Sequence, residues 1–211
     1  MIGIVANSSG EAWEKSIQAF FNSEGRNYYA SALGPCVEVL DMFIEVENPI
    51  LEPKISNKFD FKNNTHNTLS RLIERKTKGV ETLHDRIFNW GRSNKRHDQF
   101  EAAIKTLRED RYSRRAVITL WDPAKDIQNG PFDLCPVAFT LMIRGGALHC
   151  SLFIRSSDAW LATPIDMLTF IEIQKMAADA LNVNVGKYVH HAVSYHMYNY
   201  DIPRARMVFR L

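Results

Sequence analysis

Residues 137–181 read VAFTLMIR-GG-ALHCSLFI-RSSDAWLATP-IDMLTFIEIQKMAADAL and decide the fold that we expect. The segments 137–144 and 147–154 are apolar runs of strand length on either side of Gly145-Gly146, a pair typical of a hairpin turn. Residues 165–181 are apolar over a length that suits a helix. A hairpin followed by a helix able to cover it predicts a layered structure of sheet and helices.

The flanking sequence adds further elements of both kinds. Trp13, Ile17, Phe20 and Phe21 recur at helical spacing, whereas the region after residue 36 alternates as a strand does. The expected helices are 11–22, 68–76, 96–109 and 165–181, the further expected strands are 37–47, 116–121 and 187–194, and 52–67 is an expected loop. We expect one α+β domain over residues 1–211, with a large mixed or antiparallel sheet packed against helices.

Composition limits the classes of function. The chain has 211 residues, 45% of them hydrophobic and 24% charged, which is ordinary for a globular protein. A net charge of +2 gives no reason to expect a nucleic-acid partner. No apolar run approaches the roughly 18 residues of a membrane span. We therefore expect neither nucleic acid nor membrane as a partner.

The cysteines and the N-terminus bear on the compartment. Cys36, Cys135 and Cys150 are an odd number, widely spaced, and form no CxxC pair, so we expect neither a disulfide framework nor a metal site. Residues 1–7 lack the basic region and apolar run of a signal peptide. A reducing, cytoplasmic compartment is the expectation.

Cys135 is a candidate nucleophile because it stands between a loop and the expected strand 137–144. A lone cysteine is more commonly buried packing, so both interpretations remain open from this residue alone. Attack requires the thiolate, and at an ordinary pKa near 8.5 only about 3% is ionised at pH 7. Arg155, at the end of the next strand, is placed to raise that fraction.

Two further groups suggest a nucleotide. Arg114-Arg115 and Arg155-Ser156 pair guanidinium groups with hydroxyls, which suits a phosphomonoester, although arginine pairs also cap helices and solvate surfaces. His196 and Tyr198 fall on one side of an extended segment, where they can hold a sugar hydroxyl or simply pack.

The order and spacing of these groups resemble the folate-dependent thymidylate synthase family, which includes the pyrimidine nucleotide hydroxymethylases. The similarity covers about 90 residues. It runs through Tyr112-Ser113-Arg114-Arg115, Trp121-Asp122, Cys135, Gly146-Ala147-Leu148, Arg155-Ser156-Ser157-Asp158, Pro164-Ile165-Asp166 and His196-Met197-Tyr198.

The resemblance implies a role for each matching residue. Cys135 is the expected nucleophile that adds to C6 of the pyrimidine, so that C5 can take a one-carbon unit from 5,10-methylenetetrahydrofolate. Arg155 and Ser156 are expected to bind the 5′-phosphate. Arg114 and Arg115 are expected to reach the phosphate in a neighbouring subunit, which implies a homodimer formed sheet to sheet.

The remaining matches imply contacts with the base, the sugar and the folate. Asp158 corresponds to a position that touches both the base and the pterin of the folate co-substrate, and His196 and Tyr198 correspond to the pair that holds the sugar 3′-hydroxyl. The partner implied is a pyrimidine nucleoside monophosphate. The 3′ contacts leave ribose and deoxyribose equally open.

Asp166 is the departure that bears on specificity, and it belongs to the expected catalytic set. Thymidylate synthases resemble one another in carrying asparagine here, which suits uracil. Cytosine presents an acceptor at N3 and an amino donor at C4, and a carboxyl group can share a proton with the first and accept from the second. A matched polar pair in a buried pocket is worth on the order of 10⁴-fold in discrimination. Aspartate resembles the cytidylate hydroxymethylases.

We therefore expect a CMP or dCMP 5-hydroxymethylase. The alternatives are a thymidylate synthase acting on dUMP, and a nucleotide-binding relative in which one-carbon transfer is lost or altered. No residue separates hydroxymethyl from methyl transfer directly, and DNA modification of the phage type and nucleoside natural-product synthesis are both compatible.

The sequence also departs from the family pattern. Pro136 stands where many synthases have histidine, and Ala162 replaces a usual glycine. No clear counterpart of the family's catalytic glutamate occurs in residues 60–80. The nearest candidates for the unmatched N-terminal positions are Asp60 or Glu74 for the glutamate, Leu83 or His84 for a tyrosine, and Arg26 for a phosphate arginine.

Overall fold

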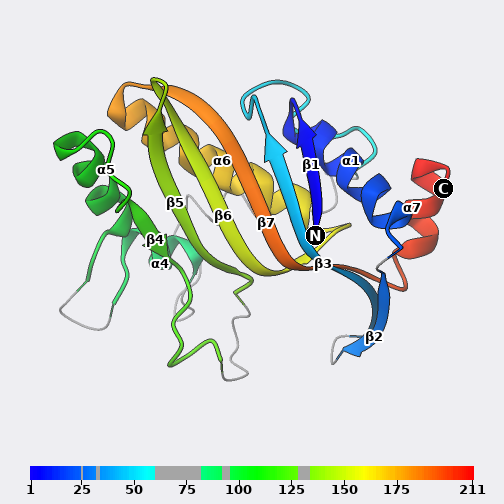
Figure 1. The fold of residues 1–211 in the computed structure, drawn as a ribbon. Coiled ribbons are helices and arrows are strands. Elements are labelled where there is room, and N and C mark those ends of the chain that lie inside the picture. Colours follow the sequence, from blue (N-terminus) through cyan, green and yellow to red (C-terminus); the bar gives the residue numbers. More distant parts are fainter. Residues whose placement is uncertain (25, 32–33, 60–81, 92–95, 128–133) are drawn as a thin grey trace.

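The computed structural model describes residues 1–24, 26–31, 34–59, 82–91, 96–127 and 134–211. Within them a seven-stranded sheet is backed by helices along one face (Figure 1). The strands are β1 (Ile2–Ala6), β2 (Asn27–Ser31), β3 (Gly34–Val46), β4 (Val117–Thr119), β5 (Pro136–Arg144), β6 (Ala147–Asp158) and β7 (Asn184–Tyr198). The helices are α1 (Ser9–Asn22), α4 (Leu83–Phe88), α5 (Gln99–Glu109), α6 (Ala162–Leu181) and α7 (Ile202–Phe209).

The sheet is mixed, which confirms the α+β prediction. The strand order is β1-β3-β7-β6-β5-β4, with β2 paired to β3 outside this path. β1 with β3 and β6 with β7 are parallel pairs, and the other pairs are antiparallel. β7, the last strand of the chain, therefore lies in the middle of the sheet.

The predicted hairpin is confirmed. Gly145 and Gly146 join β5 to β6 with φ angles of 56° and 81°. Positive φ at both central residues is the requirement of a two-residue turn that matches the twist of the strands, and glycine meets it without a Cβ penalty.

α6 covers β6 and β7, and it positions the site because of how its two ends are tied. Near its C-terminal half, Gln174 donates from Nε2 to the carbonyls of Leu148 (2.8 Å) and Gly186 (3.0 Å), at the beginnings of the two strands. In its first turn, Thr163 shares a 2.8 Å hydrogen bond with Ser157. The N-terminus of α6 is thereby held beside the carboxyl end of β6.

α1 packs behind the N-terminal strands and reaches the same carboxyl ends. Ser8 caps it by accepting from Glu11 N, and the predicted apolar side is buried at Trp13, Ile17 and Phe20. The Trp13 indole donates to the carbonyl of Ala159 at 2.8 Å, just beyond β6. This contact joins the two halves of the sheet behind the site.

Several expectations differ from the structure. The strand expected at 116–121 is present but shorter, and it is buried on one face only: β4 lies at the end of the sheet path, and Val117 is 46% exposed while Ile118 is buried. An edge strand with one buried face alternates in this way. The last strand runs further in both directions than 187–194, and the elements β1, β2, α4 and α7 were not expected. The expected helix 68–76 and the latter part of the expected loop 52–67 lie outside the described residues.

A buried ion pair supports the segment that precedes the site. Arg86 on α4 makes two hydrogen bonds to the Asp126 carboxylate (2.8 and 3.0 Å) and one to the carbonyl of Leu120 (3.0 Å). The side chains of the pair are 2% and 4% exposed, so the charges are compensated by this geometry rather than by water. Along the described stretches of chain, no helix is long and apolar enough to cross a membrane.

Candidate active site

Cys135 lies immediately before β5. β5 begins at the end of the sheet where β6 and β7 finish (Figure 1). The backbone N–H of Arg155 donates to the Cys135 carbonyl at 3.1 Å, and the Arg155 Nε donates to the neighbouring carbonyl of Leu134 at 3.2 Å. Cys135 is half-buried, whereas Cys36 and Cys150 are buried. The predicted nucleophile is thus the most accessible of the three thiols and adjoins the predicted cation.

Burial separates the other two thiols from Cys135 chemically. Desolvation strongly raises the pKa of Cys150, and it also raises the pKa of Cys36, with the charge of Glu38 acting in the same direction. Both therefore resist forming the reactive thiolate near neutral pH.

The guanidinium of Arg155 lies over an aromatic ring. Its central carbon is 5.3 Å from the centroid of Trp121, whose backbone N–H bonds the Val137 carbonyl at 3.1 Å. A guanidinium over an aromatic face is restrained in orientation, because the ring attracts the positive charge. This arrangement suits the predicted role of binding an anionic group.

Three polar side chains form one row across the sheet. Asp158 on β6 and Glu38 on β3 both pair in register with His196 on β7, from its two sides. We call Glu38, His196 and Asp158 the cross-strand row. Next to it, the Ser156 hydroxyl lies 3.4 Å from His196 Nδ1, and the Tyr198 ring centroid lies 5.2 Å from that of His196. Four of the predicted residues therefore converge on a single surface.

The electrostatics of this surface follow from burial. Desolvation raises the pKa of the Asp158 carboxyl, while backbone N–H bonds from Trp160 (2.9 Å) and Leu161 (3.1 Å) oppose that rise. Desolvation lowers the pKa of His196, although the charge of Asp158 opposes that change. His196 is therefore a neutral imidazole near pH 7, able to donate from one nitrogen and accept at the other.

Asp166 lies in the first turns of α6, close enough to Asp158 for their charges to interact. Burial, and secondarily the charge of Asp158, raises the pKa of Asp166 to about 7. Part of its surface remains open even though protein surrounds the carboxyl group. Among the described residues, the Asp166 carboxyl group forms no hydrogen bond with another side chain or with the backbone. A carboxyl group of this kind can both donate and accept near neutral pH.

Arg114 and Arg115 are not brought to this surface within one chain. Both are exposed and precede β4, where Val117 pairs with Thr140. At about 3.3 Å per residue along β5, they lie roughly 20 Å from Cys135. Their predicted role at a neighbouring subunit stays a prediction.

The unmatched N-terminal candidates gain no support. Asp60 and Glu74 lie outside the described residues. Arg26 is exposed, donates to the Ser23 carbonyl at 3.0 Å, and lies with its guanidinium carbon 5.9 Å from the Phe21 ring centroid. Leu83 and His84 begin α4, Pro136 begins β5 and Ala162 begins α6.

One side chain at this surface was not predicted from the sequence. Glu38 belongs to the cross-strand row, and its carboxylate accepts a hydrogen bond from Ser194 of β7. Pairing between β3 and β7 brings Glu38 to the site from a distant part of the chain. No local pattern could have indicated it.

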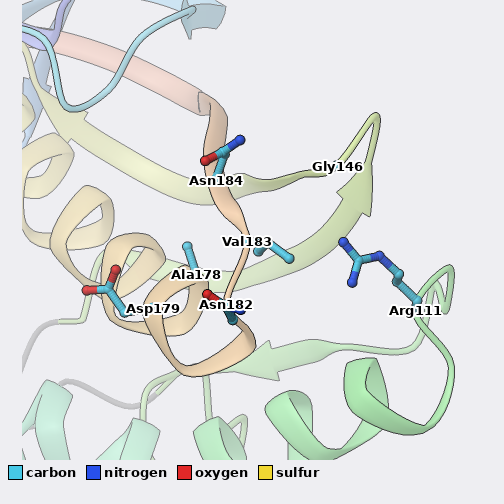
Figure 2. Close-up of a pocket in the computed structure, with 7 residues that line it drawn as sticks. All are labelled: Arg111, Gly146, Ala178, Asp179, Asn182, Val183 and Asn184. Atoms are coloured by element: carbon cyan, nitrogen blue, oxygen red, sulfur yellow. The ribbon is translucent and has the colours of Figure 1, made fainter.

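A cavity of about 330 Å³ lies elsewhere, between the C-terminus of α6 and the β5–β6 turn (Figure 2). It is lined by Arg111, Gly146, Ala178, Asp179, Asn182, Val183 and Asn184. At about 1.5 Å per residue, the length of α6 puts it roughly 20 Å from Asp166. It is therefore separate from the predicted active site.

A mixed sheet that presents a half-buried thiol, an arginine over an aromatic ring and a row of polar side chains suits an enzyme of the α+β class. The family model described as thymidylate synthase matches residues 60–210. The chain belongs to the thymidylate synthase family, whose enzymes transfer a one-carbon unit and use methylenetetrahydrofolate as co-substrate.

Two curated relatives agree with this assignment. A protein of Methanocaldococcus jannaschii named "Putative thymidylate synthase" is 28% identical over 167 residues, which cover 76% of this chain and 75% of the relative. The "Thymidylate synthase" of Listeria monocytogenes serotype 4b is 28% identical over 109 residues, 52% of this chain. The second match spans only 34% of that relative's length.

Proposed function

We propose that the protein transfers a one-carbon unit from methylenetetrahydrofolate to C5 of a cytidine monophosphate, CMP or dCMP, and forms the 5-hydroxymethyl product. The Cys135 thiolate bonds to C6, and the displaced electron pair makes C5 a carbon nucleophile. C5 bonds to the methylene carbon while that carbon is still attached to a folate nitrogen. C5 then loses its proton as the carbon–nitrogen bond breaks, so that tetrahydrofolate leaves and an exocyclic methylene remains on C5. Water adds to the exocyclic methylene, and the thiolate leaves as the ring double bond re-forms.

The observation that carries the base preference is the environment of Asp166. With a pKa of about 7, its carboxyl group retains a proton over much of the physiological range. It can give that proton to cytosine N3 and accept from the 4-amino group. Cytosine alone offers a basic ring nitrogen that can hold the proton, so the pair can become charge-assisted, and such bonds are about twice as strong as neutral ones.

The remaining roles follow the surface around Cys135. Arg155 and Ser156 bind the 5′-phosphate, and His196 and Tyr198 hold the sugar hydroxyl. Asp158 contacts the base and the folate. The position of the Arg155 guanidinium over the Trp121 ring supports the first role, because the ring restrains the orientation of the cation.

Assembly is the second part of the proposal. Arg114 and Arg115 are exposed and remote from the thiol of their own chain, as expected if they complete the site of a second subunit in a homodimer. We also infer that residues 1–211 form one domain, because a single sheet joins β1 at one end to β4 at the other.

A product assay with four nucleotides tests the base preference. CMP, dCMP, UMP and dUMP are each supplied with methylenetetrahydrofolate, and the product mass distinguishes hydroxymethyl from methyl. We expect a cytidine nucleotide to be preferred. Asp166→Asn should move the preference towards uracil by two or more orders of magnitude, which is part of the roughly 10⁴-fold discrimination that matched polar groups can supply. A wild-type preference for dUMP would contradict the base assignment.

Release of tritium from C5 of labelled nucleotide separates the enzyme from a binding relative. Release that depends on Cys135 supports attack at C6, whatever one-carbon product forms. Tight nucleotide binding without release from any of the four would reject the enzymatic proposal.

A further inference from the structure

We propose that Glu38 is a further substrate-binding residue, whose carboxylate accepts a hydrogen bond from a hydroxyl of the nucleotide sugar beside His196 and Tyr198. The inference rests on the proposed nucleotide site, but it does not depend on which one-carbon product forms.

The placement of Glu38 comes from strand register. Glu38 pairs directly with His196 in the antiparallel β3–β7 ladder, and Cys36 pairs with Tyr198. Directly opposed residues face the same side of a sheet, with their Cβ atoms about 5 Å apart. Glu38 is therefore the neighbour of His196 on the side away from Asp158.

The carboxylate is already oriented. One oxygen accepts from the Ser194 hydroxyl, which fixes the side chain along β7. Within the part of the chain that the structure describes, the other oxygen, Oε2, receives no hydrogen bond and no cation pairs with it. Glu38 is half-buried, so this acceptor is only partly surrounded by protein and can be reached by a ligand on the surface beside His196.

The chemistry of an unfilled carboxylate oxygen selects its ligand. An ionised carboxylate accepts and cannot donate, so it requires a donor such as a hydroxyl group, and it repels a phosphate. Its field reaches His196, since the charge of Glu38 acts to raise the pKa of that imidazole. The sugar of a nucleotide carries hydroxyl donors and no charge of its own, so it suits this acceptor.

Glu38 also lies outside the region that the family model covers, which begins at residue 60. β3 is thus a part of this chain that the family's matched segment does not include. A sugar contact from β3 makes the N-terminal strands part of the binding surface as well as part of the fold.

Binding of three nucleotides to three proteins tests the inference. The ligands are CMP, dCMP and 2′,3′-dideoxycytidine monophosphate, and dissociation constants are measured by calorimetry. The proteins are the wild type, Glu38→Gln and the control Glu45→Gln, which changes a carboxylate on the same strand that binds Lys187 instead.

We expect Glu38→Gln to weaken binding of the hydroxyl-bearing nucleotides by about 10-fold or more, as for loss of a charged hydrogen bond. Binding of the dideoxy ligand should change by less than about twofold, because it has no hydroxyl to lose the bond. Glu45→Gln should leave all three unchanged. A greater loss with CMP than with dCMP assigns the contact to the 2′-hydroxyl, and an equal loss assigns it to the 3′-hydroxyl.

Equal weakening of all three ligands by Glu38→Gln would show a purely structural role and overturn the inference, as would no weakening at all. The proposed function fails separately: wild-type protein that binds nucleotides without C5 chemistry rejects the reaction and leaves the Glu38 contact intact. Wild-type protein that binds none of the three rejects both.

Discussion

The two halves of the sheet contribute to the site in different ways. β5 to β7 with α6 hold Cys135, Arg155, Asp158 and His196 within one run of sequence that the family model matches. β1 to β3 with α1 precede that match, yet β3 borders the same surface through Glu38. The proposed catalytic residues are thus close together in the sequence. Glu38, in contrast, reaches the same surface only through pairing between distant strands.

One cysteine from each half offers the sharpest test of this division. Cys135→Ala should reduce turnover by at least about 10⁴-fold, because no other group supplies the nucleophile. Nucleotide affinity should change by less than about threefold, since the side chain lost is small. Single-turnover kinetics and calorimetry measure the two quantities.

The matched control is Cys36→Ala in β3. Its thiol is buried and its pKa is raised, so we expect turnover within about fivefold of the wild type. Comparable losses in the two variants would show that the division between chemistry and surface is wrong.

The comparison of the two halves assumes that each site is built from one chain. Arg114 and Arg115 allow that assumption to be tested. If Arg115 serves the neighbouring site, Arg115→Ala and Cys135→Ala are each inactive alone. Mixing them in equal amounts and allowing subunits to exchange should restore about a quarter of wild-type activity, because half the dimers are mixed and each has one intact site.

Activity is assayed before and after exchange, with the two Arg115 and Cys135 changes combined in one chain as the control. That double variant cannot form an intact site with Cys135→Ala, so no recovery is expected there. Absence of recovery in the first mixture would place Arg115 outside the neighbouring site.

The smallest effect concerns the stability cost of a functional carboxyl. The pKa of Asp166 is about 7 in the folded protein, against about 3.9 in an unfolded chain. Between these values the folded state holds more of the proton, so the free energy of unfolding falls as the pH rises from about 4 to about 7 and levels off above.

Asp166→Asn removes this titration. Its free energy of unfolding relative to the wild type should therefore rise by about 2 kcal/mol between pH 4.5 and pH 8, which allows for partial solvent screening. Urea denaturation at the two pH values measures the change. For Asp179→Asn, on the exposed last turn of the same helix, the corresponding change in the free energy of unfolding should be less than about 0.5 kcal/mol. An equal change in both variants would show that Asp166 has no special titration in the folded protein.

What could be predicted from the sequence follows the same division. The hairpin at Gly145-Gly146 and the helices at 11–22 and 165–181 were predicted because their periodicity and turn residues act locally. The strand at 116–121 was also predicted, but not its position at the edge, because apolar composition alone does not indicate whether a strand lies at an edge. Local spacing brought His196 and Tyr198 together, and β7 confirms their shared side.

The remainder depended on contacts between distant segments. β1 is only five residues long, and no strand was predicted there, although parallel pairing with β3 makes it part of the sheet. The residues around Glu38 in the sequence do not indicate a site. Glu38 became a candidate only because the strand register places it opposite His196. The elevated pKa of Asp166 likewise comes from the packing of α6, which no spacing rule predicts.

The central position of β7 has a consequence for the order in which the molecule can assemble. β3 and β6 must each leave an edge open for a strand that is synthesised after both of them. Until then two rows of backbone N–H and C=O groups lack their partner, and such edges invite pairing with other chains. Arrival of β7 closes both edges at once and in the same step sets His196 between Glu38 and Asp158. The nascent chain is thus most vulnerable to aggregation just before β7 pairs and the cross-strand row is formed.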